Sequence, residues 1–247
     1  MKLLACLTSF LIAFSANAQE PVPLARGNAP GEPHHHLKIE NEYVRVYYVE
    51  VPPHETTLLH QHDHDYIYVS LGPSEVLNAI LNKPEIHLQL KDGETHFTRG
   101  GFAHVARNLA DAPFRNVTIE LLKPQGDAHN LCAQVVLSDP PGRCDKPVAN
   151  DLAVEHQFET AECKVDVVQL SAGTDVMLHA NELAFLLVPL GDSRIRVSIR
   201  GKRAKTVRER GMVWVDAGPD VQFTNEERQT SAFLAVKFKD AALSSNR

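Results

Sequence analysis

Cysteine is scarce in this chain, which excludes a metal site built from thiolates. Only four cysteines occur in 247 residues, and none has the close pairwise spacing that such sites use. One of the four lies in an N-terminal apolar segment. Cys132 and Cys144 flank a short loop that contains Pro and Gly, and a disulfide between them is predicted if the protein is exported. The alternative pairing joins Cys144 to Cys163.

A net positive charge and a hydrophobic run of membrane-spanning length are also absent from the sequence. The formal net charge is −6, which argues against a nucleic-acid or anionic-membrane partner. The apolar stretch from Leu3 to Phe14 falls short of the roughly 20 residues that a spanning helix needs. It follows Lys2 and precedes the small-x-small sequence Ala16-Asn17-Ala18, as in a secretory signal peptide. We therefore expect residues 1–18 to be removed, and the mature protein to be periplasmic or secreted without a membrane anchor.

Helical periodicity is the third absence. Short segments with alternating apolar residues and high β-propensity follow one another, separated by turn residues such as Asp92-Gly93 and Gly100-Gly101. This pattern predicts an all-β protein made of antiparallel barrels or sandwiches. The expected strands cover residues 43–51, 66–71, 76–81, 86–90, 94–98, 103–108, 117–122, 165–170, 183–190, 195–199, 205–208, 212–215 and 232–238.

Composition divides the mature chain into two β-rich regions. Residues 19–33 are rich in Pro, Gly and Ala and are predicted to form a flexible leader. Residues 127–151 are polar, contain two cysteines and are interpreted as a linker. The regions on either side of it, residues 34–126 and 152–240, are the predicted domains, and a short tail follows.

A dense histidine cluster opens one of the expected strands. The sequence His60-Gln61-His62-Asp63-His64-Asp65 holds three imidazoles and two carboxylates within six residues. On an extended strand, residues two apart point to the same face, so these histidines can converge on one point. Imidazole and carboxylate groups are good ligands for Fe, Mn, Ni, Cu or Zn. The cluster therefore predicts a site for one divalent metal ion of unspecified identity.

Two spacings in the first β-rich region resemble the motifs of the cupin superfamily. In the first motif, Gly-x5-His-x-His precedes a Glu and then a Gly; His60-x-His62 and Gly72 match it, while Asp65 stands for the Glu one residue early. In the second motif, Gly-x5-Pro-x-Gly-x2-His-x3-Asn, the stretch from Gly93 to Asn108 fits at every position except the proline. The resemblance implies two tandem antiparallel β-barrels, a bicupin of jelly-roll type.

The same resemblance implies a ligand set. His60, His62 and His104 would hold the ion, and Asp65 would be the fourth ligand. His64 is the alternative fourth ligand, since it shares the strand face of the first two histidines. If the protein crosses a membrane unfolded and takes up its ion outside, the affinity order of divalent ions favours Cu and Zn over Fe and Mn.

Other polar residues near the cluster are assigned mainly to surface, packing or turn positions. The run His34-His35-His36 is expected to be a solvated surface segment. Tyr66 follows the cluster and is the candidate catalytic residue, because a Tyr beside a metal can act as acid or base, although such residues more often serve packing. Asn108 is expected to fix a turn.

The second β-rich region is similar to the first but has lost the site. The separation from His179 to Gly191 equals that from His60 to Gly72, which indicates a repeat. At the ligand positions after His179, however, stand Asn181, Ala184 and Val221. We expect this region to be a metal-free cupin barrel.

The function implied by the resemblance is an exported enzyme with one metal ion that acts on a small molecule, with a dioxygenase reaction favoured. A metal-dependent lyase or isomerase fits the same residues. The competing class is a non-catalytic protein that binds a small molecule or a sugar and uses the metal only for stability. The sequence leaves a homodimer open.

Overall fold

Strands account for nearly all of the regular structure. The computed structural model describes residues 24–143, 151–178 and 183–239. Within these ranges the only helical element is one 3-10 turn, η1 (Ala29–Gly31). None of these segments contains a helix with the length and apolar character needed to cross a membrane. The predicted all-β class is confirmed.

The first half of the chain forms two five-stranded sheets. The first sheet has the order β1 (Leu24–Asn28), β4 (Leu59–His62), β9 (Phe102–Asn108), β6 (Ser74–Ile80) and β7 (Ile86–Leu90). The second sheet has the order β2 (His35–Glu40), β3 (Val44–Val51), β10 (Phe114–Leu121), β5 (Tyr66–Ser70) and β8 (Thr95–Thr98). Neighbouring strands are antiparallel, except that β1 runs parallel to β4.

The second half also forms two sheets. The third sheet has the order β11 (Ala128–Asn130), β12 (Leu152–Thr160), β13 (Cys163–Leu170), β20 (Ser231–Phe238), β15 (Phe185–Leu190) and β18 (Val213–Val215). The fourth sheet has the order β14 (Asp175–Leu178), β19 (Val221–Thr224), β16 (Ile195–Ile199) and β17 (Lys205–Val207). Each predicted barrel is thus a pair of facing sheets.

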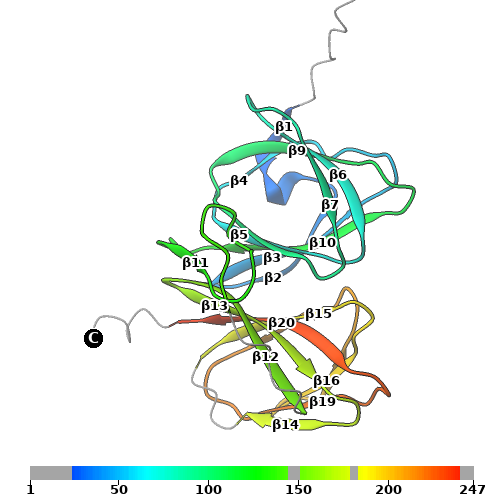
Figure 1. Ribbon diagram of the computed structural model, residues 1–247, viewed down its shortest axis with the longest axis vertical. Helices are drawn as coiled ribbons and strands as arrows, with labels where there is room; N and C mark the ends of the chain where they lie inside the picture. Colours follow the sequence, from blue (N-terminus) through cyan, green and yellow to red (C-terminus); the bar gives the residue numbers. More distant parts are fainter. Residues whose placement is uncertain (1–23, 144–150, 179–182, 240–247) are drawn as a thin grey trace, which may run out of the picture.

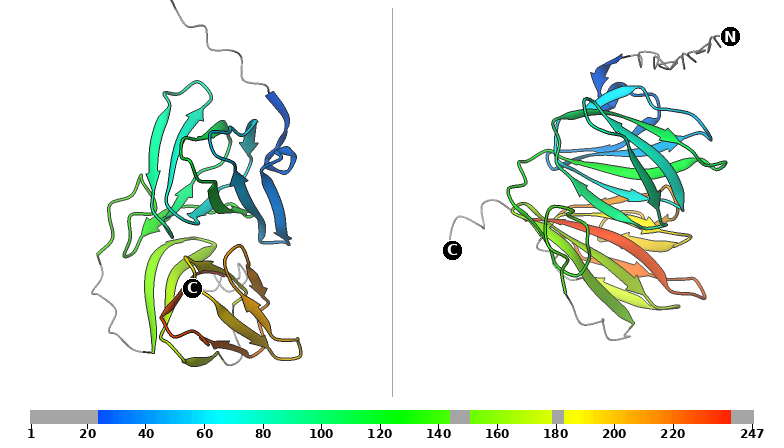
Figure 2. Two further views of the ribbon diagram at one scale, coloured as in Figure 1. Left: turned by 90° about the vertical axis from the view of Figure 1, so that its right-hand side faces the viewer. Right: turned by 45° about the horizontal axis from the view of Figure 1, so that its top comes forward.

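The halves are stacked one on the other, as Figures 1 and 2 show. The second and third sheets meet back to back and share one hydrophobic core. On β3, Val44, Val46 and Tyr48 face this shared core, whereas Tyr47 and Val49 face the interior of the first half. Because both faces of the strand are buried, its sequence is apolar almost throughout rather than alternating.

Two segments that the sequence assigns to flexible connections are part of the fold. The predicted leader ends earlier than expected, since β1 pairs with β4 from Leu24 onward and Glu32 is buried. In the predicted linker, β11 pairs with β12, and Val135 and Val136 are buried in the shared core. Local composition misled both predictions, because strand pairing and a few buried residues hold these segments in the fold.

The internal repeat is visible at matching asparagines. Asn108 donates from Nδ2 to the carbonyl oxygens of Val51, Pro52 and Ala112, at 3.1, 3.1 and 2.8 Å. Asn225 donates in the same way to three carbonyl oxygens of the second half, at 2.8 to 3.0 Å. Each buried amide therefore ties a turn to the end of a neighbouring strand, and the expected turn-fixing role of Asn108 is confirmed.

Candidate metal centre

Strands β4 and β9 bring three of the predicted ligands together. On β4, His60 and His62 are each 2 % exposed while Gln61 between them points to solvent. His104 on β9 lies directly opposite His60 in the strand register. The ring centroids of His60 and His104 are 4.5 Å apart, and His62 lies 5.1 Å from the first and 5.4 Å from the second.

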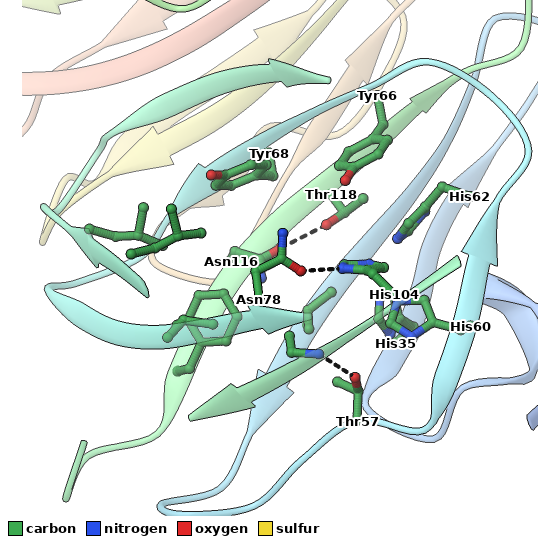
Figure 3. A pocket seen from close by; sticks show the side chains of 16 residues that line it. His35, Thr57, His60, His62, Tyr66, Tyr68, Asn78, His104, Asn116 and Thr118 are labelled. Carbon is green, nitrogen blue, oxygen red and sulfur yellow. Dashed lines mark hydrogen bonds between the residues drawn. The ribbon is translucent and has the colours of Figure 1, made fainter. Parts of the chain in front are cut away.

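A fourth histidine joins them from another sheet. The ring centroid of His35 on β2 lies 4.6 Å from that of His60 and 5.6 Å from that of His62. One nitrogen from each of these three rings falls within 4.8 Å of the others, close enough to hold one ion. Figure 3 shows the four imidazoles gathered at one side of a cavity.

The interpretation of residues 34–36 as a solvated segment is therefore wrong for His35, whose side chain is only 4 % exposed. The missed signal was Asn41. Its Oδ1 accepts hydrogen bonds from the backbone of Tyr43 and Val44 and so forms the turn of a hairpin. That hairpin pairs β2 with β3 and places His35 opposite Val49, on the wall of the cavity.

Every imidazole is held through its Nδ1 atom. His60 donates to the carbonyl oxygen of Leu58 at 2.8 Å, and His104 donates to Asn78 Oδ1 at 2.8 Å. The remaining two rings donate to carboxylates, His62 to Glu120 Oε1 at 3.0 Å and His35 to Glu32 Oε2 at 2.7 Å. Because these acceptors fix the proton on Nδ1, each Nε2 atom keeps a lone pair, and the rings are oriented as metal ligands usually are.

Two of these Nε2 atoms have no partner in the protein. The Nε2 atoms of His60 and His104 are buried and make no hydrogen bond. Leaving a buried acceptor unpaired costs about 1–3 kcal/mol. A divalent ion satisfies both atoms, since neutral imidazole is a good ligand for it. The residues present therefore fit a metal ion.

Three of the four imidazoles resist protonation because they are buried. Burial, helped by the neighbouring His35, lowers the pKa of His60 to about 3. Burial also lowers the pKa of His35 and takes the pKa of His104 well below its usual value. A ring that carries no proton on Nε2 binds a metal without first losing one.

Glu32 organises the approach of His35. Its two oxygens accept hydrogen bonds from His34 N at 2.8 Å, His34 Nδ1 at 2.9 Å, His35 Nδ1 at 2.7 Å and Leu58 N at 3.2 Å. Burial raises the pKa of Glu32, but the hydrogen bonds from His35 and His34 outweigh it and bring the pKa down to about 2. The carboxylate is thus charged and links the segment before β2 to β4.

Asp65 does not reach the histidines. Its Oδ1 accepts a hydrogen bond from Gly100 N at 3.0 Å, and its Oδ2 accepts one from Arg99 at 2.7 Å. The contact needs a glycine, because a Cβ on Gly100 would lie 2.3 Å from the carbonyl oxygen of His64. Asp65 therefore ties two loops together, and the structure offers His35 in its place as the fourth ligand.

His64 also lies outside the group. Strand β4 ends at His62, and His64 sits in the bend that follows, so it no longer shares the face of the two histidines before it. It is not among the residues that line the cavity.

Tyr66 lies at the metal centre, as expected for the candidate catalytic residue. It is 5 % exposed, and its ring centroid is 4.4 Å from that of His62. Burial raises the pKa of Tyr66, so its hydroxyl stays protonated near neutral pH and can donate a hydrogen bond. Its catalytic role stays a prediction.

A cavity of about 70 Å³ adjoins the four imidazoles. One water molecule needs about 10–15 Å³ by this measure, so the cavity has room for a few small groups. Polar uncharged side chains, including Asn78, Asn116 and Thr118, share its wall with apolar ones such as Val76 and Leu88.

In the described part of the second half, one apolar pair stands where the first half has two paired imidazoles. Leu178 on β14 pairs with Val221 on β19, as His60 pairs with His104 in the first half. Leu178 also lines a cavity of about 140 Å³ whose other lining residues are apolar except for Lys237. His179 and Asn181, which the sequence comparison singled out, lie outside the described residues.

The cysteines separate into two kinds. Cys132 is disulfide-bonded, whereas Cys163 is free and buried. Burial raises the pKa of the Cys163 thiol to about 11, which makes it unreactive. The alternative pairing through Cys163 is therefore wrong. Cys144 lies outside the residues that the structure covers, so its pairing with Cys132 stays a prediction.

Comparison with known proteins identifies the fold. No family model matches the sequence, and no curated protein matches it. Among solved structures, the cupin 2 conserved barrel domain protein from Leptotrichia buccalis superposes with a TM-score of 0.53 at 9% identity, over 83% of this chain and 88% of that one. The chain has the cupin fold.

Two further cupin-fold structures cover most of the chain. AerE from Microcystis aeruginosa aligns over 85% of this chain and 99% of its own, at 11% identity and a TM-score of 0.57. Salicylate 1,2-dioxygenase from Pseudaminobacter salicylatoxidans aligns over 92% of this chain and 80% of its own, at 14% identity and a TM-score of 0.58. Identities this low establish the shared fold only.

Replacing His35 with Ala should weaken metal binding. The variant removes one of the four imidazoles, and we expect the affinity to fall by at least about tenfold. The matched control is His36→Ala, which alters an exposed neighbour on the same strand. Equilibrium dialysis followed by elemental analysis measures both. Full metal content and unchanged affinity in the His35 variant would show that this residue is not a ligand.

Replacing Asp65 with Ala should destabilise the fold and leave the metal in place. Loss of the hydrogen bonds to Gly100 and Arg99 should lower the free energy of unfolding by about 1–2 kcal/mol. Urea denaturation measures this change, and Asp63→Ala at an exposed position is the control. If Asp65 is a ligand after all, the variant will lose metal.

The stability of the metal-free protein should depend on the pKa of His60. The unfolded chain binds a proton below about pH 6.5, whereas the folded chain binds it only below about pH 3. The free energy of unfolding should therefore fall as the pH drops through this window. His60→Gln should show a shallower fall, and the exposed control His54→Gln should not. Equal slopes for His60→Gln and the unsubstituted protein would contradict the assignment.

Proposed function

We propose that this protein is an exported enzyme with one metal ion that acts on a small molecule by a dioxygenase-type reaction. The observation that carries the proposal is the pair of buried, unpartnered Nε2 atoms on His60 and His104 at the wall of a cavity. A site that served stability alone would need no adjoining space for a ligand.

The fold neighbours support the proposal. They include salicylate 1,2-dioxygenases, three of them in structures with gentisate, and so favour oxygen chemistry on a small molecule bound in a cupin fold. Export is supported by the signal-like sequence of residues 1–18 and by the disulfide at Cys132, since disulfides persist in oxidising compartments.

The residues of the centre have distinct roles in this proposal. His35, His60, His62 and His104 would hold the ion, which supplies Lewis-acid and redox chemistry when bound. Tyr66 would act as a hydrogen-bond donor to the bound small molecule, because burial keeps its hydroxyl protonated. The apolar part of the cavity wall keeps bulk water from the reacting groups.

Oxygen uptake tests the proposal. Protein reconstituted with iron(II) or copper(II) should consume oxygen with at least one member of a panel of phenols, small organic acids, hydroxyketones and sugars. His62→Ala should lose this activity, because it removes a ligand, while His36→Ala should keep it. Mass spectrometry of the products with ¹⁸O₂ should show incorporated oxygen.

Two other outcomes would replace the proposal. Turnover of a panel member without oxygen consumption would indicate a lyase or an isomerase. Metal and ligand binding without any turnover would indicate a binding protein in which the ion has a structural role.

A further inference from the structure

The cavity at the metal centre has no fixed positive charge in its wall. Sixteen residues line it, and none of them is Lys, Arg, Asp or Glu. Its histidines are the candidate metal ligands, and an imidazole binds an ion in its neutral form, so they add no positive charge to the wall of a loaded site. An anionic ligand would therefore find no side-chain cation to pair with.

Two buried carboxylates already offset the charge of a divalent ion. Glu32 binds His35, and Glu120 binds His62, so both negative charges lie one imidazole away from the ion. Arg45 pairs with Glu120 at 3.2 Å, but it also pairs with Glu40 at 2.9 Å. The divalent ion and Arg45 carry three positive charges, and Glu32, Glu120 and Glu40 carry three negative ones. No excess positive charge remains, so a further anion would be buried without a partner of opposite charge.

The arginines near the cavity do not reach it: Arg107 on β9 is exposed and does not line the cavity, and two others are held in ion pairs. Arg99 is held by Asp65 and by the carbonyl oxygen of Gly126, at 2.7 and 2.6 Å. Arg115 on β10 is held by Glu50 at 3.0 Å. Neither residue lines the cavity, and each would have to break its ion pair to reach it.

The wall does offer neutral hydrogen-bond donors. Asn78 uses Oδ1 to accept from His104, and Asn116 uses Oδ1 to accept from Thr118 at 2.8 Å. Both amides line the cavity, and within the covered ranges their Nδ2 groups make no hydrogen bond to protein. Figure 3 shows Asn78 beside His104, between the histidines and Tyr68.

The far part of the wall is apolar. Val76 lies two residues before Asn78 on β6, and Leu88 on β7 pairs with Val76. Two residues along a strand span about 7 Å. A ligand that bonds to the ion at one end therefore meets Asn78 in the middle and Val76 and Leu88 at the other end.

We infer that the ligand of this centre is a small neutral molecule that reaches the ion through a hydroxyl or carbonyl oxygen and turns an apolar group toward Val76 and Leu88. A free carboxylate is disfavoured. This inference rests on the proposed function and narrows its substrate class, since salicylate and gentisate, named in the neighbours' structures, are carboxylates.

A matched pair of probes tests the inference. Lactamide and lactate have nearly the same shape, but only lactate carries a charge. Cobalt(II)-loaded protein is titrated with each under anaerobic conditions, and the visible spectrum of the cobalt reports binding. We expect lactamide to bind about tenfold more tightly than lactate, since the anion must be desolvated without a partner. Equal or tighter binding of lactate, or no binding of lactamide, would overturn the inference.

A variant with an added cation provides the converse test. Leu88→Arg places a guanidinium at the apolar end, and it should shift the preference toward lactate by about tenfold. Leu88→Met, an uncharged change of similar size, should leave the preference unchanged. An unaltered preference in a folded Leu88→Arg variant would contradict the inference, and the unsubstituted protein decides the question if this variant does not fold.

The binding experiment tests the ligand class separately from the proposed dioxygenase reaction. Binding is measured without oxygen and without turnover, so it does not depend on catalysis. Selective binding of lactamide with no oxygen uptake on any neutral panel member would refute the dioxygenase proposal and leave the ligand class standing.

Discussion

The arrangement of the four imidazoles depends on a buried carboxylate that lies outside the group. Glu32 is 2 % exposed and collects four N–H groups from two segments, the turn before β2 and the start of β4. A buried charge is tolerated only when it is fully hydrogen-bonded, so the four donors must stay in place together. That requirement fixes His35 relative to His60. It brings together side chains from β2 and β4, which belong to different sheets.

Three of the four imidazoles could be predicted because sequence spacing determines their geometry. His60 and His62 are two apart on one strand, and the resemblance to the second cupin motif singled out His104, which the structure places on the neighbouring strand. His35 could not be found in this way, since its position follows from a hairpin and a buried Glu32 rather than from a motif. Asp65 misled the prediction because its carboxylate is used to join two loops.

Strand prediction succeeded for segments with an apolar or alternating pattern, including the partly exposed β7 and β16, and failed for more polar ones such as β12. β3 is apolar almost throughout and β10 alternates between polar and apolar residues, and both patterns are evident in the sequence. β1, β4, β14 and β19 are short and carry polar or exposed residues, so local composition alone did not reveal them. Their strand form depends on pairing with neighbours that are distant in sequence, such as β4 with β9.

Strand β10 prevents the first half of the chain from being separated cleanly from the second. Thr118 and Glu120 serve the metal cavity and its imidazoles, while Val117, Ile119 and Leu121 between and beside them pack into the core shared with the second half. A fragment cut after the first half would expose that apolar face to water on the very strand that positions Glu120. The second half therefore supplies the apolar surface against which β10 packs, and the position of Glu120 depends on both halves of the chain.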